Sequence, residues 1–230
     1  MNHGLITIGR YNDEDDYLSS VEILNDQNEK KEWKYLSSMN NKRDNCSLTS
    51  IANKLFAVGG REDDYQYLNS SEMCDLNDDK NKNQNEVNQF ISSSSKWINL
   101  TNINHKKQSI GIKYFQNKNE IILIGGFNHH NLEESARSFS MFEMMKNKFI
   151  EYSKTSQKHS WRPGIVIENN NLIYIIGNNG YNNNSEDYPF GVIECFDIRD
   201  KKWFEIDELS KIFHNIDNKK RYFQCVLNCI

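Results

Sequence analysis

The sequence predicts an all-β fold built from four repeats, and two regularities support this prediction. The first is a set of short apolar segments that end in glycine, at Ile8-Gly9-Arg10, Val58-Gly59-Gly60, Ile124-Gly125-Gly126 and Ile176-Gly177-Asn178. The first glycines of successive segments are 50, 66 and 52 residues apart. The second is an aromatic residue that follows the glycine by 24 residues at Trp33 and Phe149 and by 26 at Trp203. A period near ~50 residues with several short strands is typical of a β-propeller blade.

The second repeat is longer because it contains a polar insertion. Gly59 and Trp97 are 38 residues apart, and the excess is residues 77–95, a run of Asn, Lys, Asp and Ser. Such a run has little apolar surface to bury, so we expect it to be solvated. The repeats then fall at about 1–40, 41–104, 105–156 and 157–206, within a single domain.

Each complete repeat divides into four predicted strands separated by short polar turns. These strands are Cys46–Ile51, Leu55–Gly60, Asn69–Leu76 and Lys96–Leu100, then Gln108–Phe115, Glu120–Gly126, Ala136–Glu143 and Lys148–Tyr152, then Trp161–Glu168, Leu172–Gly177, Gly191–Ile198 and Lys202–Ile206.

The two ends of the sequence complement each other. Residues 5–9 match the second strand of the other repeats, so the first repeat lacks its first strand. Residues 221–230 include Arg221–Leu227, which is typical of a first strand with no partner after it. We expect this C-terminal strand to complete the first of about four blades of four antiparallel strands, because a closed ring leaves no unpaired sheet edge.

Composition argues against several classes of function. The chain has 28 basic and 32 acidic residues and a net charge of −4, so it offers no basic field for nucleic acid. It has neither a signal-peptide pattern nor an ~18-residue apolar stretch, which argues against secretion and a membrane span. The five cysteines, Cys46, Cys74, Cys195, Cys225 and Cys229, have no zinc-site spacing and suit buried thiols in a cytoplasmic protein.

The residues resemble kelch repeats over nearly the whole chain, and most closely the repeats of kelch-like proteins. Gly59-Gly60 and Gly125-Gly126 are similar to the double glycine of that family, and residues 196–203, Phe-Asp-Ile-Arg-Asp-Lys-Lys-Trp, resemble its aromatic-Asp, turn, Trp signature. Arg10, Asn178 and Phe149 depart from the pattern. The repeats account for the chain, so we expect no BTB-type adaptor domain in addition.

The resemblance assigns structural roles to the repeated glycines and aromatic residues. Glycine permits a positive φ and a close approach of neighbouring chains. Large aromatic side chains can pack between adjacent blades. The residues expected in these roles are Gly9, Gly59, Gly60, Gly125, Gly126, Gly177, Trp33, Trp97, Phe149 and Trp203.

The loops between the second and third strands are the expected binding surface, because recognition concentrates on loops held by a rigid scaffold. The family resemblance implies partner contacts just after the glycines and at the start of each first strand. The candidates are Arg10, Tyr11, Arg43, Arg61, Tyr65, Phe127, Trp161, Arg162, Tyr181 and Tyr222. All four loops also hold acidic residues, which would favour a basic segment of a protein partner. The alternative is that these acidic residues simply keep the loops solvated.

An enzyme is the alternative to this binding module, because some copper oxidases have kelch-type propellers. The only adjacent histidines are His129 and His130, and no Gly-x-Ser-x-Gly or His-Glu-x-x-His motif occurs. We therefore expect no catalytic residue, metal or cofactor. Within the family, related modules are substrate receptors of cullin ubiquitin ligases or actin-associated proteins, and the resemblance implies these roles. A decoy that competes for the partners of such modules is an equally open alternative.

Overall fold

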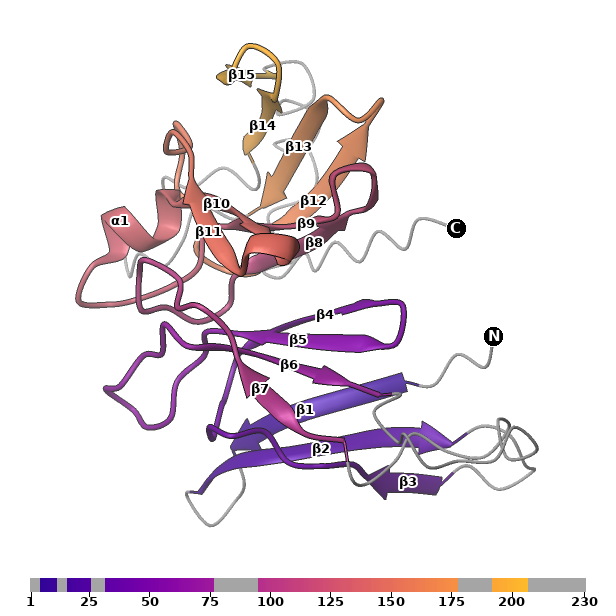
Figure 1. Cartoon of the computed structure of the whole chain (residues 1–230). Helices are drawn as coiled ribbons and strands as arrows, with labels where there is room; N and C mark the ends of the chain where they lie inside the picture. The colour runs from indigo at the N-terminus through magenta and orange to yellow at the C-terminus, as the bar shows by residue number, and fades with distance from the viewer. Residues whose placement is uncertain (1–4, 12–15, 26–31, 77–94, 178–191, 207–230) are drawn as a thin grey trace. The chain divides into compact units, whose positions relative to one another are not determined.

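The computed structural model describes residues 5–11, 16–25, 32–76, 95–177 and 192–206. The chain divides into two compact units, residues 1–103 and 104–230, and each of them contains two antiparallel sheets (Figure 1). The boundary lies within one residue of the one expected between the second and third repeats. The predicted strand at 221–227 and nearly all of the insertion lie outside the described residues.

Unit 1 contains a three-stranded and a four-stranded sheet, and in both the sheet neighbours are consecutive along the chain. The first consists of β1 (Leu5–Tyr11), β2 (Tyr17–Asn25) and β3 (Glu32–Tyr35), and the second of β4 (Ser47–Ile51), β5 (Lys54–Val58), β6 (Ser71–Asp75) and β7 (Trp97–Asn99). Val21 of the first sheet packs with Leu55, Ala57, Cys74 and Trp97 of the second. One face of each sheet is therefore apolar, and burying it holds the pair together.

Unit 2 repeats this plan with two four-stranded sheets. They are β8 (Gly111–Phe115), β9 (Glu120–Ile124), β10 (Phe139–Glu143) and β11 (Lys148–Glu151), then β12 (Gly164–Glu168), β13 (Leu172–Gly177), β14 (Val192–Asp197) and β15 (Lys202–Glu205). Phe139 of β10 lies at the centre of the core, with its ring centroid 4.8 Å from that of Phe196 and 5.3 Å from that of Trp203. Ile122, Ile124 and Met141 complete this core from the first sheet.

The structure confirms an all-β chain of four antiparallel sheets. The predicted first strands are too long, because β8 and β12 begin three residues later than expected. The reason is a residue with positive φ two positions before each strand, Ser109 at 53° and Arg162 at 42°. Asn45, two positions before β4, has the same conformation at 52°. Each first strand is thus preceded by a left-handed residue that turns the chain into the sheet.

Helical structure is limited in the described residues. α1 (Leu132–Arg137) lies in the loop before β10, and two 3-10 turns, Gln116–Lys118 and Met144–Lys146, close hairpins. Ala136 and Arg137, predicted to begin a strand, belong to α1 instead. Glu133 pairs with Arg137 one helical turn later at 3.0 Å, and its negative charge lies in the first turn, where it is favourable. No helix in the described part of the chain is long and apolar enough to cross a membrane.

Candidate partner-binding loops and their buried anchors

The glycines that close the apolar segments, here called the glycine ends, have backbone conformations that other residues rarely adopt. Gly9, Gly59 and Gly125 have φ values of 56°, 62° and 61°, and Gly60 and Gly126 have 99° and 111°. A Cβ on Gly125 would lie 1.9 Å from the carbonyl oxygen of His159, and one on Gly9 would lie 2.0 Å from that of Arg43. Each glycine therefore permits the segment that leads into the next repeat to lie directly against the end of a strand.

In unit 1, Arg61 follows the double glycine and is held from three sides. Its backbone forms two hydrogen bonds with Asp44, and its guanidinium pairs with the carboxylates of Asp44 at 3.0 Å and Asp64 at 3.6 Å. The guanidinium also lies 5.6 Å from the ring centroid of Tyr17. The Tyr17 hydroxyl donates to Asp64 at 2.7 Å, and burial together with this bond raises the pKa of Tyr17 to about 12. The base of this loop is thus held by backbone hydrogen bonds, ion pairs and a contact between a guanidinium and an aromatic ring.

The tip of the same loop is a tight turn that exposes a tyrosine. Asp63 accepts hydrogen bonds from the backbone N–H groups of Tyr65 and Gln66, at 2.7 and 2.6 Å. This is the arrangement of an Asx turn, in which the side chain fixes the local backbone. Tyr65 is 77% exposed at this tip. A large aromatic group is therefore presented to solvent on an ordered turn.

In unit 2, an aromatic pair occupies the corresponding position. Phe127 follows Gly126 as Arg61 follows Gly60, and its backbone forms two hydrogen bonds with Gln108. The Phe127 ring stacks on Trp161, with centroids 4.9 Å apart and planes 21° apart. Trp161 is 36% exposed, and the next residue, Arg162, is exposed as well. The pair offers a flat apolar surface with a neighbouring guanidinium.

Arg43 does not occupy the position expected for a partner contact. Its side chain is fully buried, and each of its three nitrogens has polar partners within unit 1. Nε donates to Glu72 at 2.8 Å, Nη1 to the carbonyls of Gly59 and Ser70, and Nη2 to the Ser70 hydroxyl, while Nη2 also forms an ion pair with Glu72 at 2.8 Å. Glu72 also accepts from the backbone N–H groups of Asn40 and Asn41. Arg43 is therefore a structural anchor that ties the segment leading into its repeat, here called the incoming segment, to β6.

A histidine and a glutamate form the comparable anchor in the fourth repeat. Glu194 on β14 is buried and accepts hydrogen bonds from the backbone N–H groups of Ser156 and Gln157, at 2.8 and 3.1 Å. Nε2 of the buried His159 lies 2.8 Å from the carboxylate. Burial alone would raise the pKa of Glu194, but the bonds from His159 and Ser156 outweigh it and lower this pKa.

The anchor at Glu194 predicts a dependence of stability on acid. Since the pKa of Glu194 is lower in the folded than in the unfolded chain, its contribution is present above about pH 4.5 and is lost as the pH falls through the folded value. Glu194→Gln is expected to reduce the free energy of unfolding at neutral pH by about 1.5–3 kcal/mol. It should also flatten the acid limb in urea titrations between about pH 5 and 3. Glu168→Gln, at an exposed glutamate of the same sheet, should keep the steep acid limb.

The other predicted residues are distributed as follows. Arg10 and Tyr11 are exposed at the end of β1, and the Tyr11 ring contacts Tyr17 edge to face at 5.2 Å. Tyr181 and Tyr222 lie outside the described residues. Trp97 and Phe149 are buried, and Trp203 is partly buried and packs against the core. Gly177 is the last residue of β13 and does not have a positive φ. Trp33 is 48% exposed, contrary to the expected core role, whereas Trp97 on the corresponding edge strand β7 is buried.

Metal-binding residues do not cluster in the part of the chain that the structure describes, where no group of three or more His, Cys, Asp or Glu side chains surrounds a common point. The rings of His129 and His130 lie with centroids 3.7 Å apart and planes tilted by 45°, and both residues are exposed. Cys46, Cys74 and Cys195 are buried as free thiols.

No protein-family model and no curated protein matches this chain.

Proposed function

We propose that the chain is a kelch-type β-propeller of four blades that binds a protein partner through its loops and performs no catalysis. Four antiparallel sheets with neighbouring strands in chain order support the propeller. The three-stranded sheet begins with β1, so one edge of β1 is without a partner strand among the described residues. In this proposal residues 221–227 pair with that edge and close the ring.

The observation that best supports binding is the presentation of aromatic side chains on rigid loop bases. Tyr65 extends from an Asx turn, and Trp161 is held by stacking on Phe127. An aromatic side chain that is already ordered before binding loses little conformational entropy when a partner covers it. Tyrosine, tryptophan and arginine are also the side chains that most often dominate the binding energy of interfaces.

The partner proposed for the unit 1 loop is a basic protein segment. Glu62, Asp63 and Asp64 lie in one turn, and Asp16 is exposed after β1. Arg61 offsets part of this charge through Asp44 and Asp64. The excess of carboxylates would attract lysine or arginine side chains, and the association would weaken as salt is added.

The biological setting of this module rests on the kelch resemblance. It favours a cytoplasmic receptor that selects substrates for a cullin ubiquitin ligase, with an actin-associated role as the alternative. Either role needs a protein-binding loop surface, and neither needs a catalytic group or metal in this chain.

The proposed function predicts that partners are lost when Tyr65 is truncated. Tyr65→Ala should reduce partner recovery in quantitative affinity capture by at least about tenfold, because a central aromatic contact contributes about 2 kcal/mol or more. Tyr35→Ala is the matched control, since Tyr35 is 74% exposed but lies on β3, away from this loop. Equal recovery with wild type, Tyr65→Ala and Tyr35→Ala would rule out this loop as the binding surface.

A further inference from the structure

One buried lysine differs from its counterparts in the other repeats. Lys107 occupies the position of Arg43, because Gln108 pairs with Phe127 in the third repeat as Asp44 pairs with Arg61 in the second. Lys107 is 2% exposed. Its Nζ donates to the Ser138 hydroxyl, as Nη2 of Arg43 donates to that of Ser70. The two repeats therefore bury a basic side chain at the same place.

The carboxylate that neutralises Arg43 is missing from this repeat. Glu72 follows Ser71, the residue opposite Val58, and Glu194 follows Ile193, the residue opposite Ile176. In the third repeat the residue opposite Ile124 is Phe139, so the corresponding position is Ser140. Lys107 forms no ion pair with any of the described residues. A hydroxyl replaces the charge that each neighbouring repeat places on its third strand.

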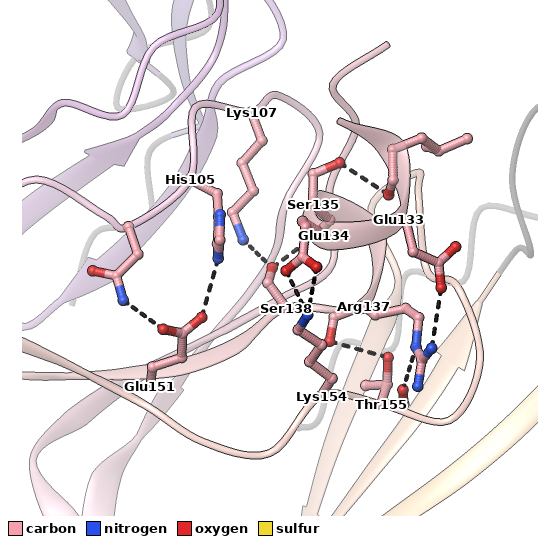
Figure 2. Close-up of polar contacts among 12 residues, drawn as sticks. His105, Lys107, Glu133, Glu134, Ser135, Arg137, Ser138, Glu151, Lys154 and Thr155 are labelled. Carbon is pink, nitrogen blue, oxygen red and sulfur yellow. Dashed lines mark hydrogen bonds and ion pairs between the residues drawn. The ribbon is translucent and has the colours of Figure 1, made fainter. Parts of the chain in front are cut away.

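A carboxylate is present instead on the adjacent strand, where it contacts different partners. Glu151 of β11 lies directly opposite Ser140 and accepts hydrogen bonds from Asn104 at 2.7 Å and His105 at 3.1 Å (Figure 2). These partners precede Lys107 as Asn40 and Asn41 precede Arg43. Glu151 thus anchors the incoming segment, but its hydrogen bonds go to that segment rather than to the lysine.

Among the described residues, the surroundings of Lys107 compensate its charge only in part. Burial lowers the pKa of Lys107 to about 7, and the charge of Glu151 offsets only part of this effect. The remaining charged groups nearby are already paired: Glu133 of α1 with Arg137 and Lys158, and Glu134 of α1 with Lys154 (Figure 2). The lysine stem is also tightly packed, because a Cβ on Gly126 would lie 3.1 Å from its Cδ.

The residues on either side of Lys107 hold the candidate binding loop. The Lys106 carbonyl accepts from the Asn128 side chain at 2.7 Å. The Gln108 backbone exchanges two hydrogen bonds with that of Phe127, at 3.0 and 2.8 Å. Phe127 in turn stacks on Trp161. A displacement of residues 106–108 would therefore release Phe127 and Asn128 together.

We propose that Lys107 is a pH-sensitive switch in the segment that holds Phe127: residues 106–108 stay in place (closed) while the lysine amine is neutral, and protonation favours their displacement (open). As a means of regulating partner binding it rests on the proposed function; as a property of the fold it does not. The open segment gives the ammonium group access to water, whereas in the closed segment its hydrogen-bond partner among the described residues is the Ser138 hydroxyl. Proton uptake therefore favours opening.

The direction and pH range follow from linkage between protonation and opening. An exposed lysine has a pKa near 10.5, so between about pH 7 and that value the open segment binds more protons than the closed one. Opening should become about tenfold more frequent for each pH unit lost in this range. Below about pH 7 both states are protonated and the dependence should level off.

Amide hydrogen exchange of the full chain tests the proposal without any partner. In wild type, the protection factors of the Gln108 and Phe127 amides, corrected for intrinsic exchange rates, should rise about tenfold per pH unit between pH 7 and 9. Lys107→Met should remove this slope and give higher protection at pH 7. Lys106→Met is the matched control, since its exposed side chain is adjacent in sequence, and it should retain the wild-type slope.

A second variant tests the missing carboxylate. Ser140→Glu places an acid where Glu72 serves Arg43, so it should keep Lys107 charged in the closed segment and flatten the slope without removing the lysine. A wild-type slope of zero, or a slope that persists in Lys107→Met, would overturn the switch. If the slope behaves as expected while Tyr65→Ala and Tyr35→Ala recover partners equally, the proposed function fails and the switch stands.

Discussion

Replacing Glu72 by alanine is expected to reduce the free energy of unfolding by about 3–5 kcal/mol. The substitution leaves the Arg43 guanidinium buried without a counter-charge and removes the acceptor of two backbone N–H groups, those of Asn40 and Asn41. An unpaired buried charge is much more costly than the loss of an ordinary hydrogen bond, because no water reaches it. Urea unfolding at pH 7 measures the effect.

Two further variants test whether the loss of stability comes from the unpaired buried charge of Arg43. Asp75→Asn disrupts an ion pair of 3.5 Å between Lys54 and Asp75 in the same sheet, where both side chains are partly exposed, and should change stability by less than about 1 kcal/mol. The double variant Arg43→Met with Glu72→Leu removes both charges and should recover much of the stability lost in Glu72→Ala. Equal losses for Glu72→Ala and Asp75→Asn would contradict the role of this anchor.

Much of the fold follows from local sequence signals. Hydrophobic runs bounded by short polar turns predicted the strands of the second, third and fourth repeats, with most boundaries within two or three residues of the observed ones. These signals are local because a hairpin needs only an apolar segment, a turn and a second apolar segment. The shortened starts of β8 and β12 were missed, because Ser109 and Arg162 are not residues that usually signal a positive φ.

The candidate site was harder to predict, because its chemistry depends on contacts between distant residues. Arg43 lies in a polar stretch typical of an exposed loop, and only its contact with Glu72, 29 residues later, explains its burial. Lys107 appears equally ordinary in the sequence. The signal that would have found it is the aligned glutamate of the third strand, present at Glu22, Glu72 and Glu194 but replaced by Ser140 in the third repeat.

The anchors and the candidate binding loops are connected through the incoming segments. In each repeat with a described incoming segment, a polar side chain of that segment is bonded to the third or fourth strand: Arg43 to Glu72, Asn104 and His105 to Glu151, and His159 to Glu194. The pairs Arg43–Glu72 and His159–Glu194 are buried, whereas Asn104 and Glu151 are exposed. The backbone of the same segments pairs with the residue after the glycines at Arg61 and Phe127. The candidate surface is thus held by polar contacts of the incoming segments, and the proposed switch sets the third repeat apart because Lys107 lacks the carboxylate that Glu72 supplies to Arg43.

Gly125→Ala is the second substitution expected to have a large effect, with a loss of about 2–5 kcal/mol in the free energy of unfolding. Two penalties combine at this position. Alanine at a φ of 61° is strained by itself, and its Cβ would lie 1.9 Å from the His159 carbonyl oxygen, which also accepts the Gly126 N–H at 2.9 Å. Relief of the collision requires the segment that holds His159 against Glu194 to move, so both the packing and the anchor are affected.

The two penalties can be separated with a matched substitution. Asn170 has a φ of 59° and is exposed, so Asn170→Ala imposes the same strain without a collision and should destabilise by only about 1–2 kcal/mol. Gly9→Ala repeats the experiment in unit 1, where the Cβ would lie 2.0 Å from the Arg43 carbonyl oxygen, and should resemble Gly125→Ala. Thermal and urea unfolding of the three variants measure the losses. If Gly125→Ala and Gly9→Ala lost no more stability than Asn170→Ala, the close approach of successive repeats at the glycine ends would be disproved.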